Sequence, residues 1–265
     1  MTSSIVLCVG LRILSAAQSG TVDTPPPADA HVAQPERPTI ATHAGTVAPG
    51  WIEVEAGGEL DRYRDGSHGG GVPVVAKVGL TRRMQLSVFG SAVSPPGTNA
   101  IGAGDVAVGA KWRLADKAPL LRRFAILPAV KLPTGSSSSG TGTGTTDVSI
   151  LLISSHDLGP VAMDVNVGYT RRSGSGATAP RDATLWTISF GGPGAGPVGW
   201  TAELYGYPAT AGPAGAHSIV ALLFGPTFVV RPWLVLDAGA IVRLAGPQPR
   251  AIYGGLVYNI GRLWK

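Results

Sequence analysis

The chain has 265 residues, of which only 14% are charged, and a formal net charge of +5. That charged fraction lies well below the ~25% of an ordinary soluble domain. The mean hydropathy of +0.22 excludes a disordered chain despite 38 glycines and 22 prolines. No apolar run reaches the ~18 residues of a membrane-spanning helix. Two classes remain: a membrane β-barrel, whose outer face contacts lipid, and a soluble all-β protein with a large core.

The basic residues occur as pairs beside predicted turns, as at Arg82-Arg83 and Arg122-Arg123. Such pairs are typical of strand ends, whereas a nucleic-acid site presents a continuous basic stripe. We therefore expect no nucleic-acid partner. Cys8 is the single cysteine of the chain, which excludes a disulfide framework.

The N-terminal part divides into two segments before any regular periodicity begins. Residues 1–17 contain an apolar run beginning at Ile5, followed by small residues, and this predicts a signal peptide cleaved near Ala17. The signal is imperfect, because no basic residue precedes the apolar run and Arg12 interrupts it. Residues 18–50 contain three consecutive prolines and little periodicity, which predicts a Pro-rich periplasmic arm or linker.

From Trp51 onward the sequence alternates between apolar and polar residues with a period of two. Val106 and Val108 share one parity, whereas Lys111 and Arg113 share the other. This is the pattern of a strand with one apolar and one polar face. We predict an all-β fold in which residues 51–265 form a transmembrane antiparallel up-and-down β-barrel of about 12 strands. The predicted strands are 51–60, 72–80, 84–93, 103–114, 122–132, 146–158, 161–171, 182–191, 198–207, 217–230, 232–244 and 250–260.

Loop length favours the membrane barrel over a soluble sandwich, which alternation alone does not exclude. Connections after the odd-numbered strands are long and polar, as in 133–145, whereas most of those after the even-numbered strands are short, as in 81–83. Short periplasmic turns and long external loops are typical of outer membrane barrels. We therefore predict a protein of the cell outer membrane whose first strand starts on the periplasmic side.

Aromatic residues are expected to gather at the periplasmic rim of this barrel. Amphipathic rings prefer the membrane–water interface, and six of them fall near the predicted periplasmic strand ends. Two of the six, Trp51 and Trp233, share the polar parity of their strands. The predicted membrane-interface aromatics are Trp51, Trp112, Phe124, Trp200, Trp233 and Tyr258.

Several motifs resemble those of a family of bacterial outer-membrane transporters grouped under the meta pathway of phenol degradation. The most specific is GAGDVAVGAKWRL at 102–114 followed by LPAVKLPTG at 127–135, and further matches lie at 37–60 and 156–171. The sequence departs from the family pattern at Arg82, where an acidic residue is expected. The resemblance implies an outer-membrane channel or transporter for small hydrophobic or aromatic compounds.

The polar parity supplies the residues that we expect to line the lumen. Unpaired charges in a narrow lumen would be costly, so these residues are expected to pair across strands. They either fill the lumen as a structural network or line a solute path and tune its selectivity. Because twelve strands enclose a narrower lumen than the 16-stranded porins, we expect a restricted or plugged channel. The candidates are Glu53, Glu55, Asp105, Lys111, Arg113, Lys131, Asp164, Glu203, Asp237 and Arg243.

No arrangement of residues predicts an enzyme, a cofactor or a metal site. The adjacent His217 and Ser218 point to opposite strand faces and do not form a catalytic pair. The expected partners are outer-membrane lipid, the outer-membrane assembly machinery and a small hydrophobic or aromatic solute, with the protein a monomer. Two alternatives remain: a non-transporting structural or adhesion-type barrel, and a soluble periplasmic lipid-binding β protein whose apolar parity faces inward.

Overall fold

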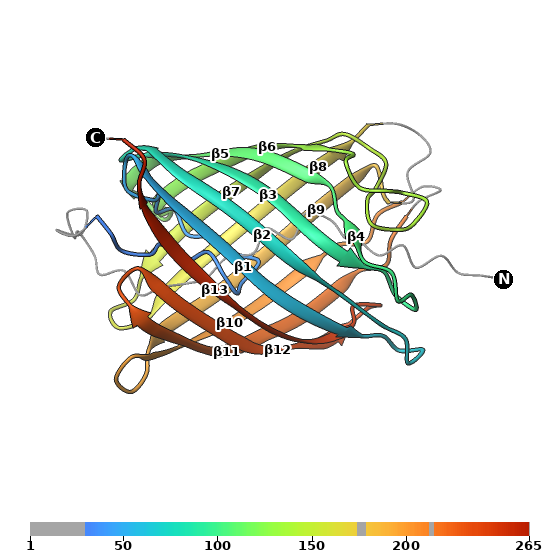
Figure 1. Cartoon of the computed structure of the whole chain (residues 1–265). Helices are drawn as coiled ribbons and strands as arrows, with labels where there is room; N and C mark the ends of the chain where they lie inside the picture. Colours follow the sequence, from blue (N-terminus) through green and yellow to red (C-terminus); the bar gives the residue numbers. More distant parts are fainter. Residues whose placement is uncertain (1–29, 174–178, 212–214, 265) are drawn as a thin grey trace.

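The protein is a β-barrel of tilted strands (Figure 1). The structure, a computed structural model, describes residues 30–173, 179–211 and 215–264. Within these residues the strands, in chain order, are β1 (Trp51–Arg62), β2 (His68–Thr81), β3 (Met84–Ser94), β4 (Gly102–Ala103), β5 (Val106–Ala118), β6 (Arg122–Leu132), β7 (Asp147–Asp157), β8 (Ala162–Arg172), β9 (Asp182–Pro193), β10 (Val198–Tyr207), β11 (Ile219–Arg231), β12 (Leu234–Ala245) and β13 (Arg250–Arg262).

Each long strand pairs antiparallel with its neighbours in the sequence, and β1 closes the barrel by pairing with β13. This confirms the predicted transmembrane-type barrel of twelve long strands. The two-residue β4 is the one departure. The strand predicted over 103–114 divides into β4 and β5, because Gly104 leaves the ladder and donates its N–H to Ser91 O over 2.8 Å. No helix among the described residues is long and apolar enough to cross a membrane.

The two ends of the barrel differ as the loop lengths predicted. At one end, here called the turn end, strands are joined by short connections such as 82–83 and 232–233. At the other, the loop end, the connections are longer, such as 133–146 and 208–218. The start of β1 and the end of β13 both lie at the turn end, since Trp51 pairs with Arg262.

The apolar parity faces outward and the polar parity faces the lumen. Along β7, Val148, Ile150 and Leu152 are exposed on the outside. On β1, Glu53 and Glu55 are buried inside. This assignment agrees with a barrel that contacts lipid with its outer surface.

Residues 30–50 are packed inside the barrel and do not form the periplasmic arm or linker that the sequence suggested for 18–50; residues 18–29 and the predicted signal peptide lie outside the described residues. Residues 30–50 lie inside the turn end of the barrel (Figure 1), where Ala33, Ile40, Ala44 and Val47 are almost completely buried. The segment is irregular, as its prolines and missing periodicity predicted. It can nevertheless be buried, because side chains of the barrel wall bind its backbone N–H groups.

Candidate functional site: the plugged lumen

Residues 31–50, here called the plug, follow the inner wall around the turn end before the chain enters β1. At the rim the His31 ring lies between two indoles, with centroids 4.9 Å from Trp51 and 5.8 Å from Trp233. The His31 Nε2 atom also lies 2.8 Å from Asn259 O. At its other end the plug rejoins the wall where Gly50 N donates to Gly79 O over 2.8 Å. The plug is therefore attached to the barrel at both of its ends.

The wall recognises the plug mainly through its backbone. Glu203 is the clearest case, because its two carboxylate oxygens accept the N–H groups of Ile40 and Ala41 over 2.7 and 2.6 Å. Several strands supply side-chain acceptors of this kind. They take the place of the backbone acceptors that a sheet or a helix would offer to the N–H groups of the segment. The other donor–acceptor pairs are Gln34 N to Glu53, Glu36 N to Glu55, Thr42 N to Asn166, Ala44 N to Ser155 and Val47 N to Gln85.

Two buried ion pairs add to these contacts. The Arg37 guanidinium donates from Nε and Nη2 to Asp237 over 3.1 and 3.0 Å. Glu36 forms an ion pair with Lys111. Arg37 reaches Asp237 only because Gly57 and Gly255 have no side chain, since a Cβ at either position would lie within 2.5 Å of the guanidinium group.

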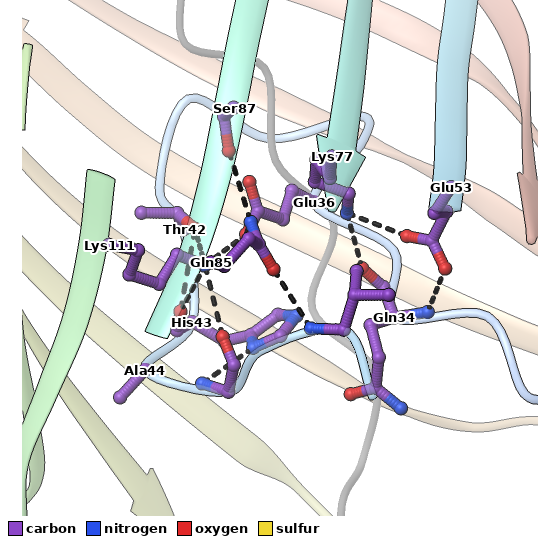
Figure 2. Close-up of polar contacts among 12 residues, drawn as sticks. Gln34, Glu36, Thr42, His43, Ala44, Glu53, Lys77, Gln85, Ser87 and Lys111 are labelled. Carbon is purple, nitrogen blue, oxygen red and sulfur yellow. Dashed lines mark hydrogen bonds and ion pairs between the residues drawn. The ribbon is translucent and has the colours of Figure 1, made fainter. Parts of the chain in front are cut away.

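Figure 2 shows the part of the plug around Glu36, which lies against charged side chains of β1, β2 and β5. Lys77 forms ion pairs with Glu53, at 2.7 Å, and with Glu55, and it donates to Gln34 O over 2.7 Å. Lys111 donates to Thr42 Oγ1 over 3.0 Å as well as to Glu36. Each lysine therefore connects the wall to the plug.

Two titratable groups of the plug have shifted pKa values. Burial alone would raise the pKa of Glu36, but Lys111 and Lys77 outweigh it and lower that pKa to about 2. Burial, followed by the charge of Lys111, lowers the pKa of His43 to about 3. Neutral His43 uses Nδ1 to accept the N–H of Gly45 over 2.9 Å. The seated plug thus requires an ionised Glu36 and a neutral His43.

Beyond the plug the lumen is lined by apolar side chains, which the sequence did not predict. Two clusters of buried residues meet at Leu185, which packs against both. Contacts with the plug are made through Ala44 in one cluster and Ile40 in the other. We call the wall members of these clusters the apolar belt: Val75, Phe89, Ala107, Ala125, Leu127, Leu151, Ile153, Leu185, Tyr205, Tyr207, Ala221, Leu223, Ile241, Ala251 and Tyr253.

Paired charges lie at the loop end, on the other side of the apolar belt. Lys131 pairs with Asp105 at 2.5 Å and with Asp147 at 3.3 Å, and Arg172 pairs with Asp147 at 3.3 Å. The Thr/Gly-rich connection 133–146 folds onto this group, since Thr143 N donates to Asp105 over 3.0 Å. The sequence predicted a long polar connection here, and its inward fold covers part of the loop end.

The predicted lumen residues therefore separate into three places. Glu53, Glu55, Lys111, Glu203 and Asp237 contact the plug directly. Asp105 and Lys131 belong to the loop-end charges. The remaining three make other contacts: Asp164 accepts from Ser155 over 2.5 Å, Arg113 pairs with Asp116 at 3.1 Å, and Arg243 donates to Gln248 O over 2.9 Å.

The six predicted interface aromatics lie toward the turn end. Trp112, Trp200 and Tyr258 are exposed on the outer face, and Phe124 follows the short connection between β5 and β6. Trp51 and Trp233 instead hold His31, which explains why these two carry the polar parity.

A contact between Ser154 and His156 was not foreseen. The Oγ–Nε2 distance is 2.8 Å, but Ser154 Oγ also donates to Leu121 O over 2.8 Å. Because the hydroxyl proton goes to that carbonyl, the imidazole is not placed to remove it. No group of three or more potential metal-binding side chains occurs in the part of the chain that the structure describes.

Known proteins share this fold and this sequence pattern. The COG4313 outer membrane channel from Pseudomonas putida F1 superposes with a TM-score of 0.63 at 11% identity, covering 81% of this chain and 97% of that one. The KdgM porin superposes with a TM-score of 0.54 at 10% identity, covering 79% and 99%. At these identities the likeness shows the fold alone. No curated protein matches the chain at a significant level. A family described as "Putative MetA-pathway of phenol degradation" matches residues 37–251, and the chain belongs to that family.

Proposed function

We propose that the protein is an outer-membrane channel for small hydrophobic or aromatic compounds, and that the plug is its gate. The observation that carries the proposal is the apolar belt. Paired polar side chains would be enough to fill a lumen that has only a structural role. This lumen instead contains Phe89, Leu151, Leu185 and Leu223, whose side chains lie on the inner face of the barrel wall. Apolar walls lower the cost of moving an apolar solute out of water.

The seated plug closes the turn end, so passage requires the plug to move. Its contacts suit a segment that leaves and returns, because most of them are hydrogen bonds from backbone N–H groups to wall side chains. Water can replace such bonds at a small net cost for each one. The family membership and the similarity of fold to an outer membrane channel support the outer membrane as the location.

Entry of a hydrophobic dye into intact cells tests the proposal. Porin-deficient cells expressing the protein are expected to take up N-phenyl-1-naphthylamine faster than cells with an empty vector. Their entry rate for nitrocefin, a hydrophilic β-lactam, is expected to stay unchanged. If neither rate changes, the channel proposal is wrong. If both rise equally, the membrane is leaking and the claimed selectivity is wrong.

A second function is favoured by the completeness of the plug contacts. A barrel whose lumen is closed by two ion pairs and by backbone hydrogen bonds to several strands could serve as a structural element of the envelope. Unchanged dye entry, together with a plug that never becomes accessible to reagents, would support that function.

A further inference from the structure

We propose that the loop-end half of the lumen contains a binding site for one small uncharged ring compound. The inference rests on the proposed channel function and locates the solute within it. The site is a cavity of about 50 Å³ lined by residues of β6, β7, β8, β9 and β10. A single water needs about 10–15 Å³ in the same measure, so the cavity holds roughly four waters, which suits one six-membered ring.

A glycine forms part of the wall of this cavity. Gly168 faces the lumen on β8, and a Cβ at this position would lie 3.1 Å from Leu151 Cδ1 and 3.5 Å from Leu185 Cβ. Leu151, Leu185 and Tyr207 form its apolar walls. Leu185 also packs against both clusters of the apolar belt, so the cavity adjoins the belt.

The charges at the cavity mouth determine the class of ligand. Lys131 and Arg172 line the cavity together with Asp147, and both cations already pair with carboxylates. Arg172 also donates to Pro180 O over 2.6 Å. Lys131 and Arg172 are balanced by Asp105 and Asp147, so a charged ligand either competes for one of these pairs or leaves its own charge uncompensated in the cavity. An uncharged ring breaks none of them.

Binding of fluorobenzene to the full chain in detergent, followed by ¹⁹F NMR, tests the site. The charged probe 4-fluorobenzoate has a ring of the same size. Gly168→Val fills the cavity, and Gly58→Val is the matched control, because Gly58 is exposed on the outer face with open space around it. Mobility shifts on boiling in SDS show whether each variant forms the barrel.

We expect saturable fluorobenzene binding that Gly168→Val weakens at least tenfold and Gly58→Val leaves within twofold. We expect 4-fluorobenzoate to bind at least tenfold more weakly than fluorobenzene. Equal affinity in the two valine variants would overturn the site, and equal affinity for the two probes would overturn the ligand class. Fluorobenzene binding without dye entry in cells would leave the site standing and reject the channel. Dye entry with unchanged binding by Gly168→Val would reject the site alone.

Discussion

At the scale of single residues, the plug depends on a few side chains that each serve several of its groups. Arg37 makes two hydrogen bonds to Asp237 across a gap that two glycines leave open. Glu203 accepts two consecutive backbone N–H groups. Removing either side chain leaves buried polar groups unpaired, and this cost exceeds the net contribution of the bonds themselves.

Arg37→Ala is expected to unseat the plug. Breaking a buried ion pair costs about 3–5 kcal/mol, and each 1.4 kcal/mol is about tenfold in an equilibrium constant. In a Cys8→Ser, Ala44→Cys background, maleimide labelling of the buried thiol introduced at position 44 should become at least tenfold faster. Arg231→Ala, at an exposed rim arginine, is the control and should leave the labelling rate unchanged. Equal rates in the two variants would show that Arg37 does not hold the plug.

Acidification is expected to loosen the plug through His43. Its pKa of about 3 in the seated plug lies below the ordinary value of 6.5. Neutral His43 therefore stabilises the seated plug fully above pH 6.5, and this stabilisation is lost as the pH falls toward 3. Between pH 7 and pH 5 the loss is at most about 2 kcal/mol, because an imidazole of ordinary pKa takes up nearly one proton over this range and the seated His43 takes up almost none. The labelling rate of the same Ala44→Cys thiol, divided at each pH by the rate for the urea-unfolded chain to remove the pH dependence of the thiolate, should rise over this range, and His43→Gln should remove that rise. A pH dependence that persists in His43→Gln would assign it to another group.

At the scale of elements, the plug and the strands have separate roles, because the strands pair without help from the plug. Four carboxylates (Glu53, Glu55, Glu203 and Asp237) and two lysines (Lys77 and Lys111) are the wall charges that contact it. Deleting 31–48 should therefore leave a folded barrel with an acidic turn end. In planar bilayers this variant is expected to conduct steadily and to prefer K⁺ over Cl⁻. A closed deletion variant would contradict the gating role, and an anion preference would contradict the charge assignment.

A charge introduced on the outward face of a strand should destabilise the folded barrel more, the closer it lies to the middle of the membrane. Leu152→Lys places a charge on the outer face near the middle of β7 and should destabilise the folded barrel by about 2–4 kcal/mol. Val148→Lys, near the loop end of the same strand, should cost no more than about 1 kcal/mol. Urea unfolding in lipid vesicles measures both values. Equal costs would show that Leu152 does not face the lipid core.

The strands could be predicted from the sequence, because their signal is local. Alternation and loop length placed twelve strands and both faces, and parity selected lumen residues such as Glu53 and Glu203. The seating of the plug could not be predicted, since its partners lie far away in the chain: Ile40 binds Glu203, which is 163 positions along. The sequence did not predict the apolar belt, because apolar residues at the inward-facing positions weaken the alternation between apolar and polar residues. Contiguous runs such as Ile150 to Ile153 were the available signal, since both faces of β7 are apolar there.

At the scale of the whole molecule, the lumen consists of three layers: a polar layer that binds the plug, the apolar belt, and the paired charges under the 133–146 connection. The seated plug in the first layer closes the turn end, and the third layer covers part of the loop end. The middle layer offers an apolar solute a surface from which little water has to be displaced at a cost. In the channel that we propose, permeability is controlled by the position of the plug, while the barrel keeps its shape.

The most direct test of this account locks the plug to the wall. Ala44 N donates to Ser155 Oγ over 2.7 Å, so the two residues are in contact, and Ala44→Cys with Ser155→Cys in a Cys8→Ser background is the pair chosen for a disulfide. The measurement is the entry of N-phenyl-1-naphthylamine into cells expressing this variant, before and after mild reduction. We predict entry at the empty-vector rate when the disulfide is formed and at the rate of the unmodified protein after reduction. Equal, rapid entry in both states would contradict the account, because the solute would then cross without the plug moving.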